Sequence, residues 1–182
     1  MIIEIEQYGA VAVEPGDDAA ADYVAAQQLT ASEAATGATD RPQDVRVLVE
    51  VQRRLGGIAP RALLGGRFVT GPGDTTRIAV AIAGFDALGG DGQPTCDSRL
   101  WRRPFTSGLP SDFGGAVLES LTKATDAGLP AGTLTVDRAG FDEINSSEVI
   151  FAQAAAFLRL SIAALLDGRD PEPLLRSAIE GW

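Results

Sequence analysis

The fold of this chain depends most on residues 106–157, which read TSGLPSDFGGAVLESLTKATDAGLPAGTLTVDRAGFDEINSSEVIFAQAAAF. The first part predicts a helix over residues 110–127, because a proline stands at its start and Gly128 follows its end. Apolar residues recur there at helical spacing, at Phe113, Val117, Leu121 and Ala124. Residues 133–137 (TLTVD) predict a strand that follows this helix.

The end of the same segment predicts a loop that enters a long helix. Asn145 and Glu148 have the spacing of a capping box, with Asn in place of Ser or Thr. The helix is expected to end near Leu166, before Gly168. A shorter helix is expected over residues 170–181, with three apolar residues on one side: Leu174, Leu175 and Ile179.

The residues upstream predict mainly strands. Apolar alternation favours strands over residues 2–6, 10–13, 45–51 and 76–83, and a further strand is considered over 98–105. The glycine-rich stretch 65–74 predicts a turn between strands. Its alternative role is a phosphate cradle, although it lacks the Gly-Lys-Ser/Thr ending of a P-loop.

One helix is expected in the N-terminal part. Asp17 or Asp18 would cap a helix that runs to about Ala35, ahead of a loop at residues 36–44. Residues 52–64 are ambiguous, because two glycines and a proline interrupt any helix there.

Three motifs of the central segment resemble domain IV of elongation factor G, the ribosomal translocase. Gly108-Leu109-Pro110 matches the family's Gly-Gly-apolar-Pro turn, and GLPAG at 128–132 matches its Gly-Pro-Leu-Ala-Gly linker with the middle residues exchanged. Asn145-Ser146-Ser147-Glu148 matches the Asp-Ser-Ser-Glu that precedes the family's second helix. The resemblance covers about residues 76–162.

The resemblance implies an α+β fold, a two-layer sandwich in which a mixed four-stranded sheet carries helices on one face. One βαβ crossover of that family is left-handed, against the usual rule. We therefore expect a domain IV-like domain over residues 71–168, with an α/β segment over residues 1–70 packed on it. A C-terminal helix over residues 169–182 would cover a hydrophobic edge or supply a homodimer contact.

The resemblance also implies a binding site, because the translocase loop before Ser-Ser-Glu reaches the decoding centre and the tRNA. A tip is expected from residues 71–75 and 139–144, with these members: Gly71, Gly73, Asp74, Gly140, Phe141, Asp142 and Glu143. Phosphate contacts are expected from three arginines, Arg99, Arg102 and Arg103. Asp142 stands where the family has a histidine. Two adjacent acids would be repelled by phosphate, but could accept hydrogen bonds from cytosine or from a protein's arginine.

Composition narrows the chemistry further. The 182 residues include 25 acids, 15 bases and no histidine, for a net charge of −10. The absence of histidine excludes histidine general bases and histidine-bound zinc, and a lone cysteine, Cys96, excludes an intrachain disulfide. Catalysis would fall to carboxylates, Arg, Ser, Tyr or Lys123. A non-catalytic binding module without cofactor or metal is therefore expected, and the resemblance to domain IV implies the ribosome or a tRNA as its partner.

Charge is unevenly distributed along the chain. Residues 41–103 hold ten arginines and six acids, whereas both flanking regions are acidic. This pattern fits an arginine-lined face for nucleic acid, or ion pairs between a basic middle and acidic ends. No apolar run reaches the roughly 20 residues of a membrane span, and no basic region precedes the first apolar residues. A cytoplasmic protein is expected.

Other interpretations stay open at this point. The oxygen-bearing residues Asp137, Asp142, Glu143, Asn145 and Glu148 could hold Mg²⁺ or Ca²⁺, and Asp142 with Glu143 could act as an acid–base pair. Cys96 could be reactive if it is exposed. The chain could also be a protein-interaction module that lost RNA binding, or a small-molecule enzyme that uses carboxylates and arginines. An exposed apolar patch or a symmetric dimer would favour the former, and a pocket with converging Arg and Asp the latter.

Overall fold

The computed structural model describes residues 1–16, 21–37, 42–88, 92–123 and 127–182. It shows an α+β protein with one mixed, mostly antiparallel sheet and three helices packed on it. The strands are β1 (Ile2–Ile5), β2 (Gly9–Pro15), β3 (Gln27–Ala34), β4 (Asp44–Arg53), β5 (Arg61–Thr70), β6 (Thr75–Ile82), β7 (Thr95–Cys96), β8 (Phe105–Ser107) and β9 (Gly132–Phe141). The helices are α1 (Ser111–Thr122), α2 (Glu148–Leu166) and α3 (Glu172–Glu180).

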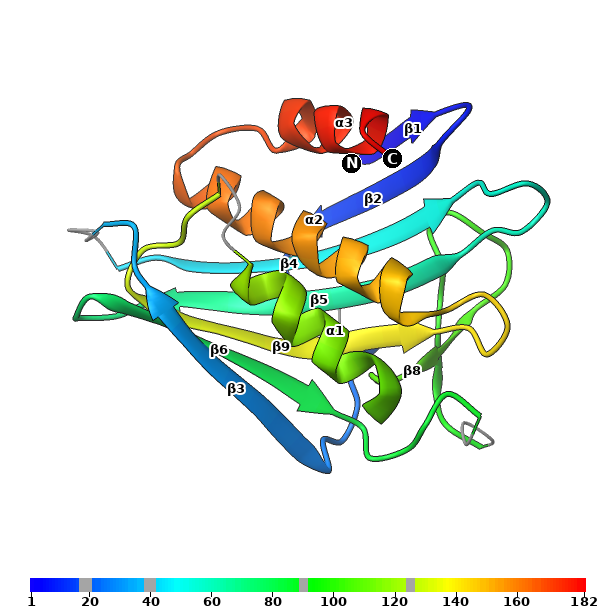
Figure 1. Cartoon of the computed structure of the whole chain (residues 1–182), viewed down its shortest axis with the longest axis horizontal. Helices are drawn as coiled ribbons and strands as arrows, with labels where there is room; N and C mark the ends of the chain where they lie inside the picture. Colours follow the sequence, from blue (N-terminus) through cyan, green and yellow to red (C-terminus); the bar gives the residue numbers. More distant parts are fainter. Residues whose placement is uncertain (17–20, 38–41, 89–91, 124–126) are drawn as a thin grey trace.

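The main sheet has the order β1-β2-β4-β5-β9-β6-β3, and the short strands β7 and β8 extend from the end of β9. All neighbouring pairs are antiparallel except β6 and β9. Helices α1 and α2 lie across the same face of the sheet, whereas α3 lies beside β1, with both chain ends nearby (Figure 1). The sheet is thus covered by helices on one face.

The core lies between this face and the helices. Alternate residues of the central strands point toward α2, as in Val47, Val49 and Val51 of β4, and are fully buried. The helix contributes Phe151 and Leu158, which are also fully buried. Burial of a side chain of this size stabilises the fold by about 1.5–3 kcal/mol.

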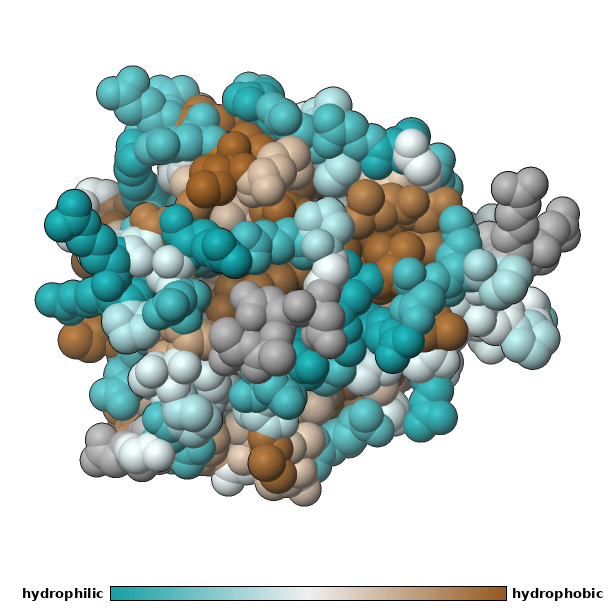
Figure 2. Space-filling model, turned by 180° about the vertical axis from the view of Figure 1, so that it is seen from behind, coloured by the Kyte–Doolittle hydropathy of each residue, from teal (hydrophilic) through white to brown (hydrophobic). Residues whose placement is uncertain are grey.

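The opposite face carries a second, smaller apolar cluster. Its members come from the segment before β3, from β4 and β5, and from β7 and β8: Ala21, Leu48, Leu63, Cys96 and Phe105. The remainder of this face is mainly hydrophilic, with smaller hydrophobic patches (Figure 2). Burial of Cys96 in this cluster, with 4% of its surface exposed, does not favour the reactive-thiol interpretation.

Several elements match the expectations from sequence. The strands expected over 2–6, 10–13, 45–51, 76–83 and 133–137 correspond to β1, β2, β4, β6 and β9, and α2 and α3 lie within a few residues of their expected ranges. Helix α1 ends at Thr122, and Ala124, expected on its apolar side, lies outside the described residues. Leu175 and Ile179 are fully buried, and the Trp182 ring packs 5.6 Å from that of Phe157. The apolar side of α3 is therefore used within this chain.

The expected helix from Asp17 to Ala35 is wrong. Residues 17–20 lie outside the described residues, and residues 27–34 form the edge strand β3. Alanine and glutamine favour helices locally, but this stretch pairs with β6 along its whole length, from Gln27 opposite Ile82 to Ala34 opposite Thr75. Tertiary pairing overrides the local preference.

The expected four-stranded sheet is also wrong, and the residues expected as an α/β segment contribute strands to the main sheet. The strands before residue 71 belong to the same nine-stranded sheet, because β5 pairs with β9 from Leu63 to Thr70. The glycine-rich stretch at 65–74 is mostly strand β5, and only its end forms a turn. Of the strand considered at 98–105, only Phe105 lies in a strand.

The capping box at Asn145 is not formed. Helix α2 begins at Glu148 with Ser147 as its N-cap, whereas the Asn145 side chain donates a hydrogen bond to Asp142. By length and composition α2 could cross a membrane, but most of this 19-residue helix is buried against the sheet and its neighbours.

Candidate functional site

The expected tip is divided between opposite ends of the sheet. Residues 71–74 form the turn between β5 and β6, and Gly71 N–H donates to the carbonyl of Ala131 just before β9 begins. Asp142 and Glu143 follow the end of β9. Ten residues of strand separate these ends by about 30 Å. Gly71, Gly73 and Asp74 therefore do not meet Asp142 and Glu143.

Two of the expected tip residues are structural. Phe141 is fully buried and its ring lies 5.8 Å from that of Phe85. Gly140 is buried in strand β9, where a Cβ atom would come within 2.7 Å of Phe105 and 3.0 Å of the Cys96 sulfur. Neither residue can present a side chain to a ligand.

A buried arginine organises the end of the sheet where β5 begins and β9 ends. The Arg61 side chain is 1% exposed. Its Nε and Nη2 lie 2.9 and 2.7 Å from one carboxylate oxygen of Asp142. Its other donors bind the carbonyls of Arg103 at 2.7 Å and Pro104 at 2.9 Å. The guanidinium also lies 4.2 Å from the centre of the Phe105 ring, so it is both paired and stacked.

The second oxygen of Asp142 shapes the loop that leads into α2, residues 142–147, called here the Asp142 loop. It accepts hydrogen bonds from the amides of Ile144 and Asn145, both at 3.0 Å. Ser146 donates from its hydroxyl to the Arg61 carbonyl at 2.7 Å and accepts from the Asp142 amide. Burial raises the pKa of Asp142, but hydrogen bonds from Arg61 and these amides outweigh it and hold the pKa below its usual value.

A second buried acid holds the neighbouring segment. We call residues 98–104 the arginine segment. The Glu50 side chain, from β4, accepts hydrogen bonds from the Ser98 hydroxyl and from the Arg99 amide at 2.6 Å. The Ser98 hydroxyl in turn accepts from the Trp101 amide at 2.8 Å. Burial raises the pKa of Glu50, against the effect of these hydrogen bonds. The arginine segment is thus tied to the sheet at Glu50 and at Arg61.

The three arginines that were expected to contact phosphate lie in this segment. They differ in whether an acid binds the side chain. Arg99 binds Glu14 at 2.9 Å, on the surface. Arg102 and Arg103 are exposed, and neither makes an ion pair with another described residue. Trp101 beside them is 37% exposed. The structure thus links the Arg103 main chain to Asp142 through Arg61, and it leaves the side chains of Arg102, Arg103 and Trp101 at the surface.

Arg61 and Glu50 were not singled out from the sequence. Arg61 follows Pro60 in the ambiguous stretch, and its partner Asp142 is 81 positions away. Glu50 alternates with valines in a strand, which by itself is typical of a solvated position. A buried arginine among apolar residues of a strand has no local sequence signal.

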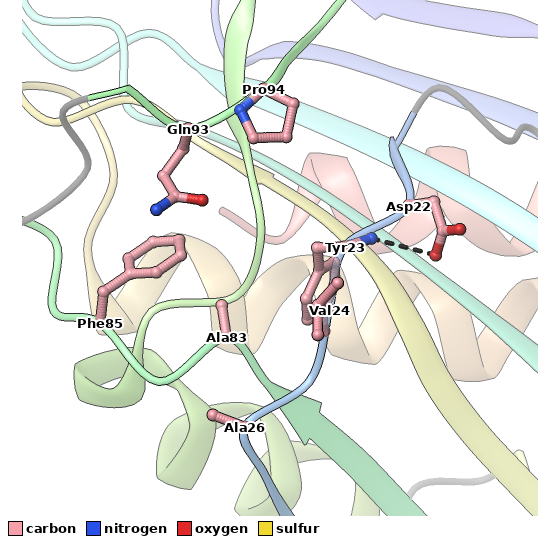
Figure 3. Close-up of a pocket in the computed structure, with 8 residues that line it drawn as sticks. All are labelled: Asp22, Tyr23, Val24, Ala26, Ala83, Phe85, Gln93 and Pro94. Atoms are coloured by element: carbon pink, nitrogen blue, oxygen red, sulfur yellow. Dashed lines mark hydrogen bonds between the residues drawn. The ribbon is translucent and has the colours of Figure 1, made fainter.

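The described residues also line a separate cavity of about 490 Å³ between the segment that enters β3 and the segment that follows β6. In Figure 3, Phe85 and Gln93 face Tyr23 and Val24 across it. The Tyr23 hydroxyl donates to the Ala81 carbonyl at 2.7 Å, and burial raises its pKa well above the usual value. The cavity contains one acid, Asp22, and no arginine among the described residues that line it.

A depression of about 600 Å³ is lined by Asp44, Arg46 and Arg67, among others. Arg46 binds both oxygens of Asp137 at 2.7 and 2.9 Å, and Arg67 binds both oxygens of Asp44. These arginines and acids thus neutralise one another.

The metal interpretation finds no geometric basis in the ranges that the structure covers. No three potential His, Cys, Asp or Glu ligands gather there. Asp137 and Asp142 are each bound by an arginine, and Glu143 is exposed. The Asp142–Glu143 pair therefore does not converge for acid–base work.

The raised pKa of Glu50 predicts a pH dependence of stability. Below 4.5, its ordinary pKa, Glu50 is protonated in both states. Between that value and the higher folded-state pKa, only the native state keeps the proton, so stability falls as pH rises. In Glu50→Gln this contribution is absent. We expect the free energy of unfolding of wild type minus variant, from urea titrations, to decrease from pH 4.5 toward neutrality.

Glu119→Gln is the control for this measurement. Glu119 is on the surface, and its hydrogen bond with Lys123 lowers its pKa. The free energy of unfolding of wild type minus Glu119→Gln should therefore rise, not fall, as the pH rises through the ordinary pKa of a glutamate. A Glu50 difference that is flat, or that rises with pH, would show that burial does not dominate at this carboxylate.

No model of a known protein family matches the chain, and no curated protein is significantly similar to it.

Proposed function

We propose that this protein is a non-catalytic binding module related to domain IV of elongation factor G. In this proposal it contacts RNA of the ribosome or a tRNA through the arginine segment and the adjoining Asp142 loop. The observation that carries the proposal is the pairing of Asp142 with Arg61. This pair neutralises one of the two adjacent acids that would repel phosphate, whereas Glu143 stays exposed. Arg102 and Arg103 are then the exposed arginines of the arginine segment that no described acid binds.

The topology supports the relationship. Strands β6 and β9 are parallel neighbours, and the chain passes between them through β7, β8 and α1. In Figure 1 both strands run to the right, α1 lies in front of the sheet, and β9 lies above β6. A right-handed crossover would place β9 below β6 in that view, so the arrangement has the uncommon left-handed sense that the resemblance implies.

The side-chain chemistry supports RNA as the ligand. Arginine binds phosphate with a planar fork, and an exposed indole offers a stacking surface for an unpaired base. Trp101, Arg102 and Arg103 are consecutive, and Glu50 and Arg61 hold their backbone in place. Because the ties to Glu50 and Arg61 already order this backbone, binding would not have to order it.

Co-sedimentation with 70S ribosomes and isolated 30S subunits, at low and moderate salt, tests this function. We expect saturable binding that weakens as salt rises, and weaker binding by Arg102→Ala/Arg103→Ala. The slope of log affinity against log salt should fall by about 1 for each phosphate contact removed. The control is Arg169→Ala/Arg176→Ala, which makes the same charge change at arginines that pair with acids elsewhere.

Equal losses in the two double variants would mean that only net charge matters, and would contradict a site at the arginine segment. Absence of binding by wild type at low salt would exclude RNA contact by this chain alone.

A protein-interaction module is the second candidate, and a specific observation favours it. Four apolar side chains near the same end of the sheet are exposed by 44–83%: Leu55, Ile58, Ile144 and Val149. Leu55 and Ile58 lie in the turn before β5, and Arg61 at its end binds the Asn145 carbonyl of the Asp142 loop. If Ile58→Asp and Ile144→Asp abolish ribosome binding while the arginine variants do not, a protein contact is the better explanation.

A further inference from the structure

The two edges of the main sheet are protected to different degrees. Strand β1 is four residues long, and α3 packs beside it. Strand β3 is eight residues long, and none of its residues is buried: five are exposed and three are half-buried. Within the described part of the chain, its partner is β6 on one side and nothing pairs with the other (Figure 1). A long, uncovered edge is a template for another strand.

The ladder shows which backbone groups remain for such a strand. The Ala35 amide donates to the Asp74 carbonyl at 2.8 Å, in line with the β3–β6 register. In an antiparallel ladder only alternate residues bond the neighbour, so the odd-numbered residues of β3 bond β6. The N–H and C=O groups of the even-numbered residues point outward, from Gln28, Thr30, Ser32 and Ala34.

The usual devices against edge pairing are weak on β3. The strand contains no lysine, arginine or proline. Its one charged side chain, Glu33, binds the buried Arg159 at 2.7 Å and is itself only 17% exposed. The charge is therefore held on the helix-covered face and does not protect the edge.

We propose that β3 pairs antiparallel with β3 of a second copy of this chain, so that two sheets join across a two-fold axis. With Ala31 on the axis, the outward residues form four pairs: Gln28 with Ala34, Thr30 with Ser32, and their symmetry equivalents. Each pair exchanges two backbone hydrogen bonds.

The side chains suit this pairing with a second copy. Thr30 and Ser32 lie opposite each other on the uncovered face, where hydroxyl pairs stabilise neighbouring strands. On the helix face Glu33 lies opposite Leu29, so no like charges meet. Only the small side chain of Ala31 lies at the axis. The strand is thus complementary to itself, as a symmetric interface requires.

Sedimentation velocity and light scattering of the whole chain test the proposal. We expect wild type to reach twice 18.9 kDa as concentration rises. Thr30→Pro should raise the dimer dissociation constant by more than about tenfold, because proline removes an outward N–H on both copies and leaves the bonds to β6 intact. Thr30→Val keeps the N–H and should dimerise like wild type.

Amide hydrogen exchange on wild type gives a test that needs no variant. In a monomer, the amides of Leu29 and Ala31 are protected by β6 while those of Thr30 and Ser32 exchange fast. In the proposed dimer all four are protected, increasingly so at high concentration. Fast exchange at Thr30 and Ser32 in a dimer, or a dimer that survives Thr30→Pro, would place the interface elsewhere. A wild-type chain that stays monomeric at every concentration would overturn the proposal.

Discussion

Replacement of Arg61 by methionine is expected to lower the free energy of unfolding by about 3–5 kcal/mol. The Arg61 side chain is buried and binds the Asp142 carboxylate and two main-chain carbonyls. Methionine fills part of the same space but leaves Asp142, 12% exposed, without its cation. An unpaired, partly buried carboxylate and two carbonyls without their donors account for the size of the loss. Urea denaturation followed by circular dichroism measures it.

A double-mutant cycle separates the ion pair from packing. Asp142→Asn alone removes the charge but keeps hydrogen-bonding atoms, and it leaves Arg61 uncompensated. If the two groups act as a pair, Arg61→Met/Asp142→Asn should cost clearly less than the sum of the single losses. Arg176→Met, which breaks an exposed pair with Glu172 on α3, should cost less than about 1 kcal/mol. Similar losses at Arg61 and Arg176 would contradict a special role for burial.

The second large effect is expected at Gly132, the last residue of the GLPAG motif at 128–132. Gly132→Ala should destabilise the fold by about 3 kcal/mol or more. Gly132 opens β9 between β5 and β6, opposite Thr70 on one side and Thr76 on the other. A Cβ atom there would lie 2.4 Å from the Val69 carbonyl oxygen and 3.0 Å from Thr70 Cα, and φ is +159°. These neighbours are backbone atoms of a central strand, so they cannot move aside at low cost.

Gly115→Ala is the matched control for this substitution. Gly115 lies on the exposed side of α1, and a Cβ atom there meets nothing within 4 Å. Alanine should stabilise the helix by about 0.5–1 kcal/mol. Both substitutions replace a glycine by alanine and so add the same methyl group. If the free energy of unfolding falls in Gly132→Ala and rises in Gly115→Ala, the loss comes from close packing at Gly132 and not from the removal of a glycine as such. If Gly132→Ala is tolerated as well as Gly115→Ala, the packing at the start of β9 is looser than described.

Local patterns were sufficient where one element's own periodicity determined its type. The alternation in VRVLVEV and TRIAVAI follows from a strand with one face on the core, and it located β4 and β6 within a residue or two. The apolar spacing of α1 and α2 similarly reflects one buried side. The apolar pattern of residues 27–34 did not predict their strand. An edge strand buries too little to impose an apolar pattern, and the composition of this stretch favours a helix.

Only part of the candidate site could be predicted from the sequence. The sequence placed arginines at 99, 102 and 103 and an acid before Ser-Ser-Glu, but it could not show that Arg61 neutralises that acid. It also joined residues 71–75 with 139–144 in one tip, whereas they lie at opposite ends of β9.

The amino-acid sequence by itself determined the elements with a strong apolar period, such as β4, β6, α1 and α2, because these periods depend on neighbours a few positions apart. It also determined the net charge and the absence of histidine, and these limit the catalytic and metal-binding chemistry that the chain can perform. Only the tertiary structure decided the strand order, the uncovered edge at β3 and the pairing of Arg61 with Asp142. Each of these depends on contacts between residues tens of positions apart, and such contacts form only when the whole sheet is assembled.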